Sequence, residues 1–299
     1  MKVTVTGGTG FVGKAIVGLL RERGFQISIL GRSPRTGIPP EVELFLWEAE
    51  RSEPPPNSLA GSDVVIHLTG EPVSRRWTPE IRRRMRSSRV EGTRKLVAAI
   101  GKLDRKPSAL VAASAVGIYG DRGEEELTED SPPGEGFLAD VCREWEAETS
   151  RATEMGIRTV MLRIGVVLGV GGGALDQMLP PFRMFLGGVL GSGRQWMSWI
   201  HLADLAGLIL HAVEDPQLRG VVNAVAPAPV RNAQFTRTLA RTIRRPALFA
   251  VPEFGLKLLF GDMAQILLAS QRIYPRAAEK AGYRFLYPEL GPALKNLLG

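Results

Sequence analysis

Several residue types and patterns are scarce or missing in this chain, and their absence excludes whole classes of protein. A single cysteine, Cys142, excludes an intrachain disulfide and is typical of a reducing compartment. Arg158 and Arg163 interrupt the most apolar stretch, residues 157–175, so no membrane-spanning helix is predicted. No Cys/His group has zinc spacing, and we find no RNA-binding signature, lysine-rich tail or internal repeat. The sequence therefore predicts a soluble cytoplasmic protein without a metal site, and a first strand beginning at Lys2 leaves no room for a signal peptide.

What is present is an ordinary globular composition with a basic balance. The 299 residues are 44% hydrophobic and 23% charged, which is enough to bury a large core. The formal net charge of +7 is compatible with nucleic acid, with an anionic surface or with an acidic cofactor. The missing nucleic-acid signatures disfavour the first of these partners.

The amino end of the chain carries the strongest motif. Residues 2–6 form a β-branched run, Gly7-Gly-Thr-Gly10-Phe-Val-Gly13 follows directly, and an apolar-periodic helix then ends at Gly24. In a strand–turn–helix unit, Gly7 lets the backbone reverse, Gly10 lets it approach a pyrophosphate, and Gly13 lets the helix pack closely. The pattern predicts a dinucleotide site at the helix amino terminus; the alternative is a glycine turn with only a structural role.

The end of the next strand indicates which dinucleotide is bound. Residues 25–30 read as a strand that ends in Gly31-Arg32-Ser33, and no acidic residue follows until Glu41. An NAD site usually places a carboxylate here for the ribose hydroxyl, whereas a guanidinium suits the 2′-phosphate of NADP. We therefore predict NADP(H) as the cofactor; in the alternative, Arg32 is solvated at the end of a strand.

Alternating strands and helices predict an α/β fold, a Rossmann-type doubly wound parallel sheet with a smaller, mostly helical C-terminal substrate lobe. We assign residues 1–165 to the NADP-binding domain, with the sheet completed by about 195–226, and residues 166–194 and 227–299 to the lobe. A helix is expected at 175–185, kinked or split by Pro180 and Pro181, and another that Asn232 caps.

Several single residues allow both a structural and a functional interpretation. Trp47 lies where an adenine ring would rest, but a core position is equally compatible. His67, inside an apolar strand, reads as a core histidine. Helix 79–100 carries a basic face, which is most simply exposed to solvent. Among its arginines, we expect Arg89 to contact a phosphate.

Together these segments resemble the extended short-chain dehydrogenase/reductase superfamily. The resemblance rests on the opening Thr-Gly-Gly-Thr-Gly-Phe-Val-Gly, the strand ending at Leu68-Thr-Gly70, the Ser-x-x-x-x-Tyr-Gly segment at 114–120 and Trp199-Ile-His-Leu-Ala-Asp204. Further segments, such as Leu179-Pro-Pro-Phe-Arg183 and Pro229-Val-Arg-Asn232, are similar to its NAD-dependent epimerase/dehydratase "epimerase family protein" branch, which ends in a small domain of unknown function. The resemblance implies nucleotide contacts from Gly7, Thr9, Gly10, Phe11, Val12, Gly13, Gly31, Arg32, Leu68, Thr69, Gly70, Arg89 and Arg163. It also implies candidate substrate contacts in the lobe from Arg194, Gln195, Trp199 and His201, and a packing role is equally compatible for Trp199.

The catalytic residues of the superfamily are where this chain departs from the pattern. Extended members use a Ser or Thr, a Tyr that exchanges the hydroxyl proton, and a Lys four residues after it. Here the Tyr and Lys positions hold Leu138 and Cys142, and the usual Ser position holds Ala115, with Ser114 one residue earlier. Tyr119 is the best substitute acid/base, with Ser114 beside it as the second catalytic candidate.

Three functional interpretations remain. An intact cofactor site favours an NADP-dependent oxidoreductase or epimerase, monomeric or homodimeric, acting on a carbonyl or sugar-nucleotide-like small molecule. The missing Tyr-x-x-x-Lys pair favours a catalytically inactive NADP(H)-binding sensor or regulatory protein. The basic helix would also suit a nucleic-acid or surface-binding module.

Overall fold

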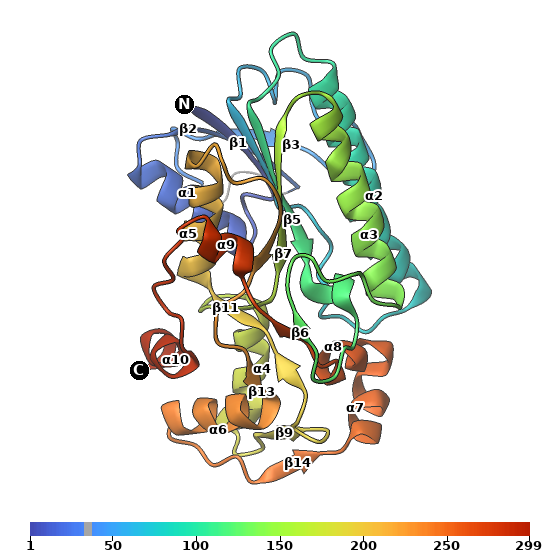
Figure 1. Cartoon of the computed structure of the whole chain (residues 1–299), viewed down its shortest axis with the longest axis vertical. Coiled ribbons are helices and arrows are strands. Elements are labelled where there is room, and N and C mark those ends of the chain that lie inside the picture. Colours follow the sequence, from blue (N-terminus) through green and yellow to red (C-terminus); the bar gives the residue numbers. More distant parts are fainter. Residues whose placement is uncertain (33–37) are drawn as a thin grey trace.

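A seven-stranded parallel sheet forms the centre of the computed structural model, which describes residues 1–32 and 38–299 (Figure 1). The strand order is β12-β7-β5-β4-β1-β2-β3, so the chain builds outward from β1 in one direction and then returns to build outward in the other. The carboxyl ends of β1 and β4 border this reversal, which is where ligands bind in doubly wound sheets. The strands are β1 (Lys2–Thr6), β2 (Gln26–Gly31), β3 (Glu43–Leu46), β4 (Val64–His67), β5 (Ala109–Ala115), β7 (Arg158–Ile164) and β12 (Gly220–Ala224).

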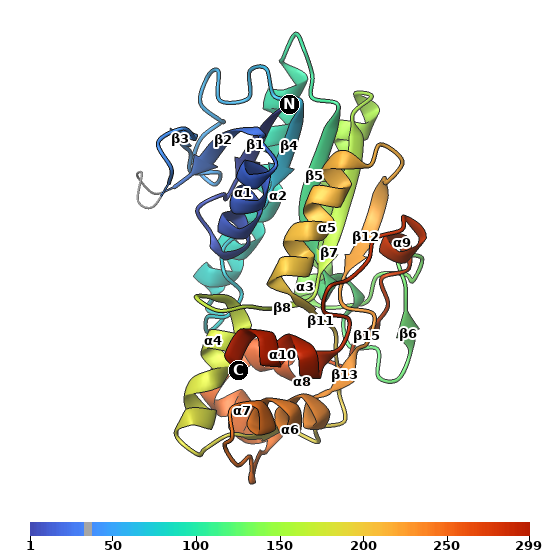
Figure 2. The same ribbon diagram turned by 90° about the vertical axis from the view of Figure 1, so that its left-hand side faces the viewer.

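Helices cover both faces of this sheet. On one face α2 (Pro79–Gly101) and α3 (Phe137–Glu154) lie side by side, and on the other α1 (Phe11–Glu22) packs against α5 (Leu202–Glu214) (Figures 1 and 2). β4 and the first six residues of β5 are buried throughout, as expected for strands covered on both faces. The predicted Rossmann-type doubly wound parallel sheet is confirmed.

Each pair of helices packs against its own face of the sheet, with a separate apolar core between helices and sheet. Ile16, Leu20 and Ile209 belong to the core under α1 and α5, whereas Leu96 and Leu110 belong to the core under α2. His67 at the end of β4 is fully buried; its ring hydrogen-bonds with Thr6 Oγ1 and Thr93 Oγ1, and burial lowers its pKa to about 4. The interpretation of His67 as a core histidine is confirmed.

The remaining chain forms a mostly helical lobe beyond the carboxyl edge of the sheet (Figure 2). Paired short strands and a 3-10 turn at Val116–Tyr119 connect it to the sheet. The predicted assignment of residues 1–165, with the sheet completed by about 195–226, to the NADP-binding domain and of residues 166–194 and 227–299 to the lobe stays a prediction. The helices of the lobe are α4 (Gly173–Arg183), α6 (Asn232–Thr242), α7 (Glu253–Phe260), α8 (Ala264–Leu268) and α10 (Leu290–Leu298), and the strand pairs are β6 (Glu126–Leu127) with β15 (Arg272–Ile273), β8 (Val166–Leu168) with β11 (Trp199–His201), β9 (Gly188–Leu190) with β14 (Phe249–Val251), and β10 (Trp196–Met197) with β13 (Val230–Arg231). Helix α9 (Arg276–Lys280) instead packs against β12 at the edge of the central sheet (Figure 2).

One local prediction in the lobe is wrong, and another is wrong only in part. Helix α4 is continuous through Pro180 and Pro181, so it is not split there; the alternative, a kink, stays a prediction. Asn232 does not cap α6, because Arg231 is the N-cap residue and the Asn232 side chain instead accepts a 2.9 Å bond from the backbone of Leu190. None of the helices within the described residues is long and apolar enough to cross a bilayer.

Candidate functional site

The glycine turn after β1 brings the backbone of α1 against the end of the sheet. Gly7 has φ +72°, and Gly10 N donates to Gly7 O at 2.9 Å. A β-carbon on Gly13 would lie 2.2 Å from Gly7 O and 2.6 Å from Gly8 Cα, so only glycine permits this approach. The predicted roles of Gly7 and Gly13 are confirmed.

The first turn of α1 presents bare backbone at the carboxyl edge of the sheet. Gly10 is the N-cap residue, and within the described residues no side chain caps this helix. A β-carbon on Gly10 would meet Gly7 O at 3.2 Å, and the helix opens with Phe11-Val-Gly, which carries no negative charge. Free N–H groups at the positive end of a helix bind phosphate, so this cradle fits the pyrophosphate of a dinucleotide.

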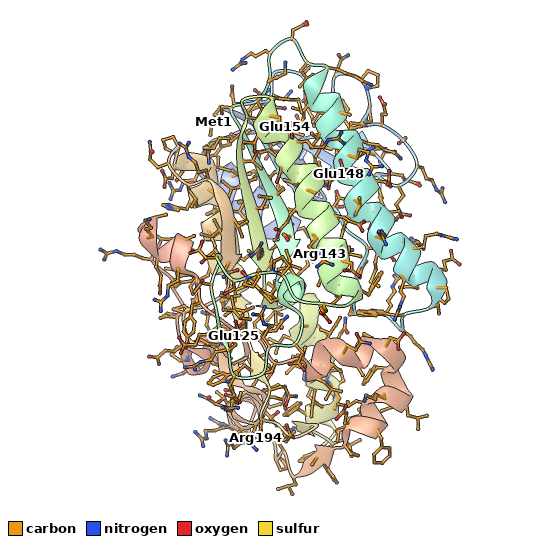
Figure 3. The ribbon with its side chains drawn as sticks, turned by 45° about the vertical axis from the view of Figure 1, so that its right-hand side comes forward. Met1, Glu125, Arg143, Glu148, Glu154 and Arg194 are labelled. Carbon is orange, nitrogen blue, oxygen red and sulfur yellow. The ribbon has the colours of Figure 1, made fainter. Side chains whose placement is uncertain are left out.

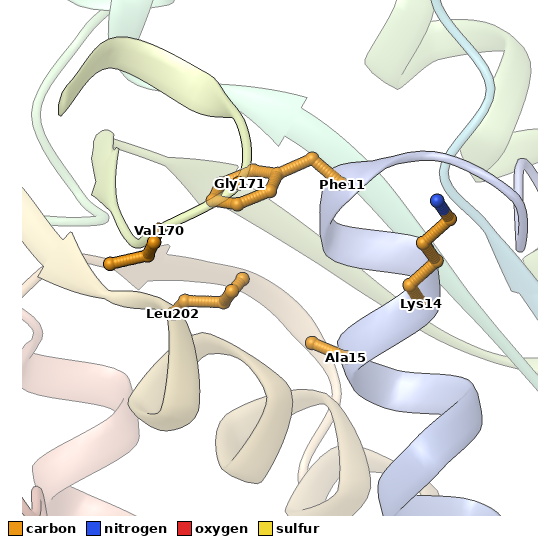
Figure 4. A pocket seen from close by; sticks show the side chains of 6 residues that line it. All are labelled: Phe11, Lys14, Ala15, Val170, Gly171 and Leu202. Atoms are coloured by element: carbon orange, nitrogen blue, oxygen red, sulfur yellow. The ribbon is translucent and has the colours of Figure 1, made fainter. Parts of the chain in front are cut away.

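The side chain of Phe11 packs against a glycine-rich loop from the lobe. β-carbons on Gly169, Gly172 and Gly173 would each lie within 2.7 Å of the Phe11 ring. Figure 4 shows the ring turned toward this loop beside a pocket of about 370 Å³, which α1, Val170 and Leu202 also line. The glycines thus make room for the ring, and the backbone N–H of Phe11 stays at the helix terminus.

The end of β2 carries a guanidinium, as the NADP prediction requires. Arg32 is 54% exposed, and its Nη1 lies 3.4 Å from Glu71 Oε2, beyond the end of β4. Ser33 lies outside the described residues. Trp47 is buried in the core, and its Nε1 donates to Ser52 O at 3.0 Å, which confirms the core interpretation of this residue.

Leu68, Thr69 and Gly70 line the neighbouring strand end. A β-carbon on Gly7 would lie 3.1 Å from Leu68 C, and Thr69 Oγ1 donates to Thr6 Oγ1 at 3.0 Å. Gly70 is backed by Arg89, whose Nη1 donates to Glu71 O at 2.9 Å and to Met85 O at 3.2 Å. Burial lowers the pKa of Arg89, whose guanidinium also lies over the Trp145 ring. Arg89 therefore supports the backbone of the loop after β4 from its position on α2.

A chain of polar side chains runs from the carboxyl end of β5 to β7 through α3. Ser114 Oγ donates to Glu146 Oε1 at 2.6 Å. Arg163 Nε and Nη2 donate to the two oxygens of Glu146, each at 2.9 Å. Because Arg163 makes a two-pronged ion pair on α3, its guanidinium is committed to Glu146, and the hydrogen bonds of the described residues direct it there rather than toward the nucleotide turn.

Tyr119 lies at the far end of this chain and is fully buried. Its hydroxyl is within 2.8 Å of Arg163 Nη1, from which it accepts, and it donates toward Asn223 Oδ1 at 2.7 Å and Thr128 O at 3.0 Å. Burial raises the pKa of the phenol against the opposing effect of Arg163. A buried hydroxyl with three partners inside the protein suits an internal, positioning role, and the catalytic role expected for Tyr119 stays a prediction.

The positions that hold Tyr and Lys in extended dehydrogenases are apolar here. Leu138 packs in a cluster with Trp77, Met85 and Met263, which joins α2 and α3 to the lobe. Cys142, one turn further along α3, is buried, and burial raises its thiol pKa to about 12. A neutral buried thiol is inert, so Cys142 packs here as a small hydrophobe.

Most lobe residues that we expected at the substrate are used internally. Trp199 is fully buried and donates to Ala228 O at 3.0 Å. Gln195 Nε2 donates to Leu190 O and Leu267 O, and His201 Nδ1 accepts from Ala203 N as the cap of α5. Arg194 is exposed within the lobe (Figure 3).

Sequence reasoning missed two acidic residues. Glu146 lies four and eight residues after Cys142 and Leu138, so it shares their face of α3; this spacing could have identified it. Glu71 follows β4 directly, yet only the structure shows that its buried carboxylate gathers arginines from three segments. In residues 1–32 and 38–299, no group of three His, Cys, Asp or Glu side chains could hold a metal.

The doubly wound sheet, the glycine cradle at its switch point and the guanidinium after β2 define a dinucleotide-binding α/β protein of the Rossmann class. Comparison with known proteins narrows this further. Residues 3–224 match the NAD dependent epimerase/dehydratase family, to which the chain belongs, and residues 251–297 match a domain of unknown function, DUF1731.

The relatives of this chain span nearly its whole length. It is 41% identical over 303 residues to the chloroplastic epimerase family protein SDR39U1 homolog of Arabidopsis thaliana, covering all of this chain and 87% of that protein. The structure of human epimerase family protein SDR39U1 with NADPH superimposes with a TM-score of 0.90 at 38% identity, covering 100% of this chain and 99% of the other. A nucleoside-diphosphate sugar epimerase structure from Corynebacterium glutamicum is 35% identical, with a TM-score of 0.82, covering 100% of this chain and 58% of that one.

Proposed function

We propose that this chain is an NADP(H)-dependent oxidoreductase that interconverts a carbonyl compound and its alcohol, with Ser114 and Glu146 in place of the missing Tyr-x-x-x-Lys pair. The observation that carries the proposal is the 2.6 Å hydrogen bond from Ser114 Oγ to Glu146 Oε1 at the carboxyl end of β5. The glycine cradle fits the coenzyme, and the solved relative from human carries NADPH.

When bound, NADP(H) exchanges a hydride with the carbon of the substrate. The protein must then move one proton at the substrate oxygen. In the direction of alcohol oxidation, Ser114 Oγ accepts the hydroxyl proton while its own proton passes to Glu146; in the direction of reduction the same two transfers run backward. Ser114 and Glu146 are already hydrogen-bonded, so no large rearrangement separates the two transfers.

Arg163 holds the carboxylate in position for this transfer. Its two donors bind both oxygens of Glu146 in a fork, which fixes the plane of the carboxylate. Tyr119 and Thr128 O close the network from the lobe side, so the guanidinium cannot swing away. Arg163 is therefore a positioning residue for Glu146.

The surroundings of Leu138 favour a carbonyl on an apolar molecule over a sugar nucleotide. Val73, Ile81, Phe137 and Ile266 are partly buried around this cluster and form an apolar wall beside α3.

A second function, NADP(H) binding without turnover, is favoured by one observation. Ser114 is only 3% exposed and Cys142 is neutral, so no strongly activated group faces open solvent at this site. Such a protein would bind the coenzyme and report its presence through the lobe.

The test is a panel of quinones, aldehydes, ketones and UDP-sugars, followed by NADPH absorbance. We expect turnover on an apolar carbonyl compound, and we expect Ser114→Ala and Glu146→Gln each to lower kcat about 100-fold with NADPH affinity retained. Glu144→Gln is the matched control, because Glu144 lies on the same helix but pairs with Arg86 at the surface. Tight NADPH binding without turnover on the panel would favour the second function, and full activity of Glu146→Gln would exclude the relay.

A further inference from the structure

Three arginines from different segments meet at one buried carboxylate beside the end of β2. Glu71 has a side chain that is only 2% exposed. Its Oε1 accepts from Arg75 Nη1 at 3.1 Å, and its Oε2 lies 3.4 Å from both Arg32 Nη1 and Arg84 Nη2. Arg32 follows β2, Arg75 lies in the loop after β4, and Arg84 lies on the second turn of α2.

Glu71 itself is fixed from the other side. Its backbone N–H donates to Ser88 Oγ at 3.0 Å, and its carbonyl accepts from Arg89 at 2.9 Å. The carboxylate therefore cannot turn outward, and it holds the three guanidinium groups at their inner edges. This arrangement differs from an NAD site, where a carboxylate faces the ribose and accepts from its hydroxyl.

The outer edges of the three guanidinium groups face solvent. The side chains of Arg32, Arg75 and Arg84 are 54%, 57% and 38% exposed. Each guanidinium has five N–H donors, and within the described residues the bonds to Glu71 use one donor of each, with a further Arg84 atom 3.9 Å from Glu50. Three cations against the two carboxylates of Glu71 and Glu50 leave a net positive charge with many free donors.

We propose that Arg32, Arg75 and Arg84, gathered by Glu71, form one site for the 2′-phosphate of NADP(H), so that Arg75 and Arg84 determine coenzyme preference together with Arg32. The inference rests on the proposed NADP(H) binding. In this class of fold the adenosine ribose lies at the end of β2, where Arg32 stands. A phosphate dianion there neutralises the excess charge, and it accepts from several guanidinium groups at once. Glu71 never contacts the phosphate and is a positioning residue.

The experiment measures affinity and needs no substrate. The full chain and its Arg75→Ala and Arg84→Ala variants are titrated with NADPH, NADH, 2′,5′-ADP and 5′-AMP; the last two ligands differ only in the 2′-phosphate. We expect each variant to bind NADPH and 2′,5′-ADP about tenfold more weakly, with NADH and 5′-AMP changed by less than about twofold. The matched control is Arg83→Ala, one residue away on α2, with a side chain that is 76% exposed and directed to Glu80.

The dependence of coenzyme affinity on salt gives a second readout, which a purely structural role of these arginines would not change. NADPH affinity of the wild type should fall more steeply with KCl than NADH affinity, and each variant should flatten the NADPH slope. Arg84→Lys should recover part of the preference, because it keeps the charge and loses the planar fork. If correctly folded Arg75→Ala and Arg84→Ala bind NADPH and NADH more weakly by the same factor, or keep the wild-type preference for NADPH, this inference is overturned while the proposed function stands. A wild-type chain that binds neither coenzyme would overturn the proposed function as well.

Discussion

Arg163 and Tyr119 are locked together at the carboxyl edge of the sheet. The guanidinium donates to the phenol oxygen at 2.8 Å, and its central carbon lies 5.0 Å from the centre of the phenol ring. This pairing directs the remaining donors of Arg163 to Glu146. The phenol thus supports the arginine that supports the carboxylate, and the proposed relay through Ser114 and Glu146 leaves it out of the proton transfer.

Replacing Tyr119 by Phe tests that separation. The change leaves an Arg163 N–H and the Asn223 side-chain oxygen without this partner in a buried position. We therefore expect the free energy of unfolding, measured in urea, to be about 1–3 kcal/mol lower than that of the wild type. Turnover should stay within a few-fold of the wild type. Loss of turnover at unchanged stability would instead return Tyr119 to the chemistry.

The thiol of Cys142 should be unreactive in the folded protein. Burial raises its pKa to about 12, so hardly any thiolate exists near neutral pH. We expect a thiol reagent such as iodoacetamide to label the native chain far more slowly than the urea-unfolded chain, as measured by mass spectrometry. Rapid labelling of the native chain, with loss of NADPH binding, would make Cys142 a functional residue.

His67 should make the protein less stable in mild acid. Its pKa of about 4 in the folded state lies below the ordinary value of 6.5, because burial disfavours the charged ring. The unfolded chain therefore binds the proton more tightly, and the contribution of neutral His67 is complete above pH 6.5 and is lost as the pH falls toward 4. This loss amounts to roughly 3 kcal/mol.

Denaturation in urea at a series of pH values measures the slope. We expect His67→Gln to be less stable near neutral pH but to show a flatter dependence between pH 6.5 and pH 4. An identical slope in the variant would assign the acid sensitivity to other groups.

Asp204 ties the C-terminal segment to α5. Its buried carboxylate accepts from the backbone N–H groups of Leu286 at 2.6 Å and Tyr287 at 2.9 Å. Asp204→Ala leaves both backbone N–H groups without their acceptor. We therefore expect the free energy of unfolding to fall by about 3 kcal/mol and hydrogen exchange in α10 to become faster. Asp104→Ala, at an exposed position, is the control and should change stability by less than about 0.5 kcal/mol. Unchanged exchange in α10 of Asp204→Ala would contradict this role.

Sequence reasoning predicted the fold because its signals are local. Strand–turn–helix order and glycine spacing identify the cradle at Gly7–Gly13, and unbroken apolar runs identify buried parallel strands such as β4 and β5. The expected helix at 79–100 agrees with α2 to within one residue.

The site was harder to predict because its polar contacts join distant segments. Ser114 and Glu146 are 32 residues apart, and Glu71 and Arg32 are 39 apart; no periodic pattern links such pairs. The burial of Tyr119 could not be predicted, since the sequence shows a tyrosine after a strand but not the segments that cover it. Asn232 was misplaced by one residue, because its carboxamide prefers a strand partner over the helix that it begins.

Calorimetric titration of the full chain with NADPH and with NADH tests the central claim most directly. The bare backbone at Gly7–Gly13 and the guanidinium of Arg32 predict saturable binding of both coenzymes, with NADPH bound about tenfold more tightly or better. A chain that binds neither coenzyme, or that binds NADH more tightly than NADPH, would contradict the account.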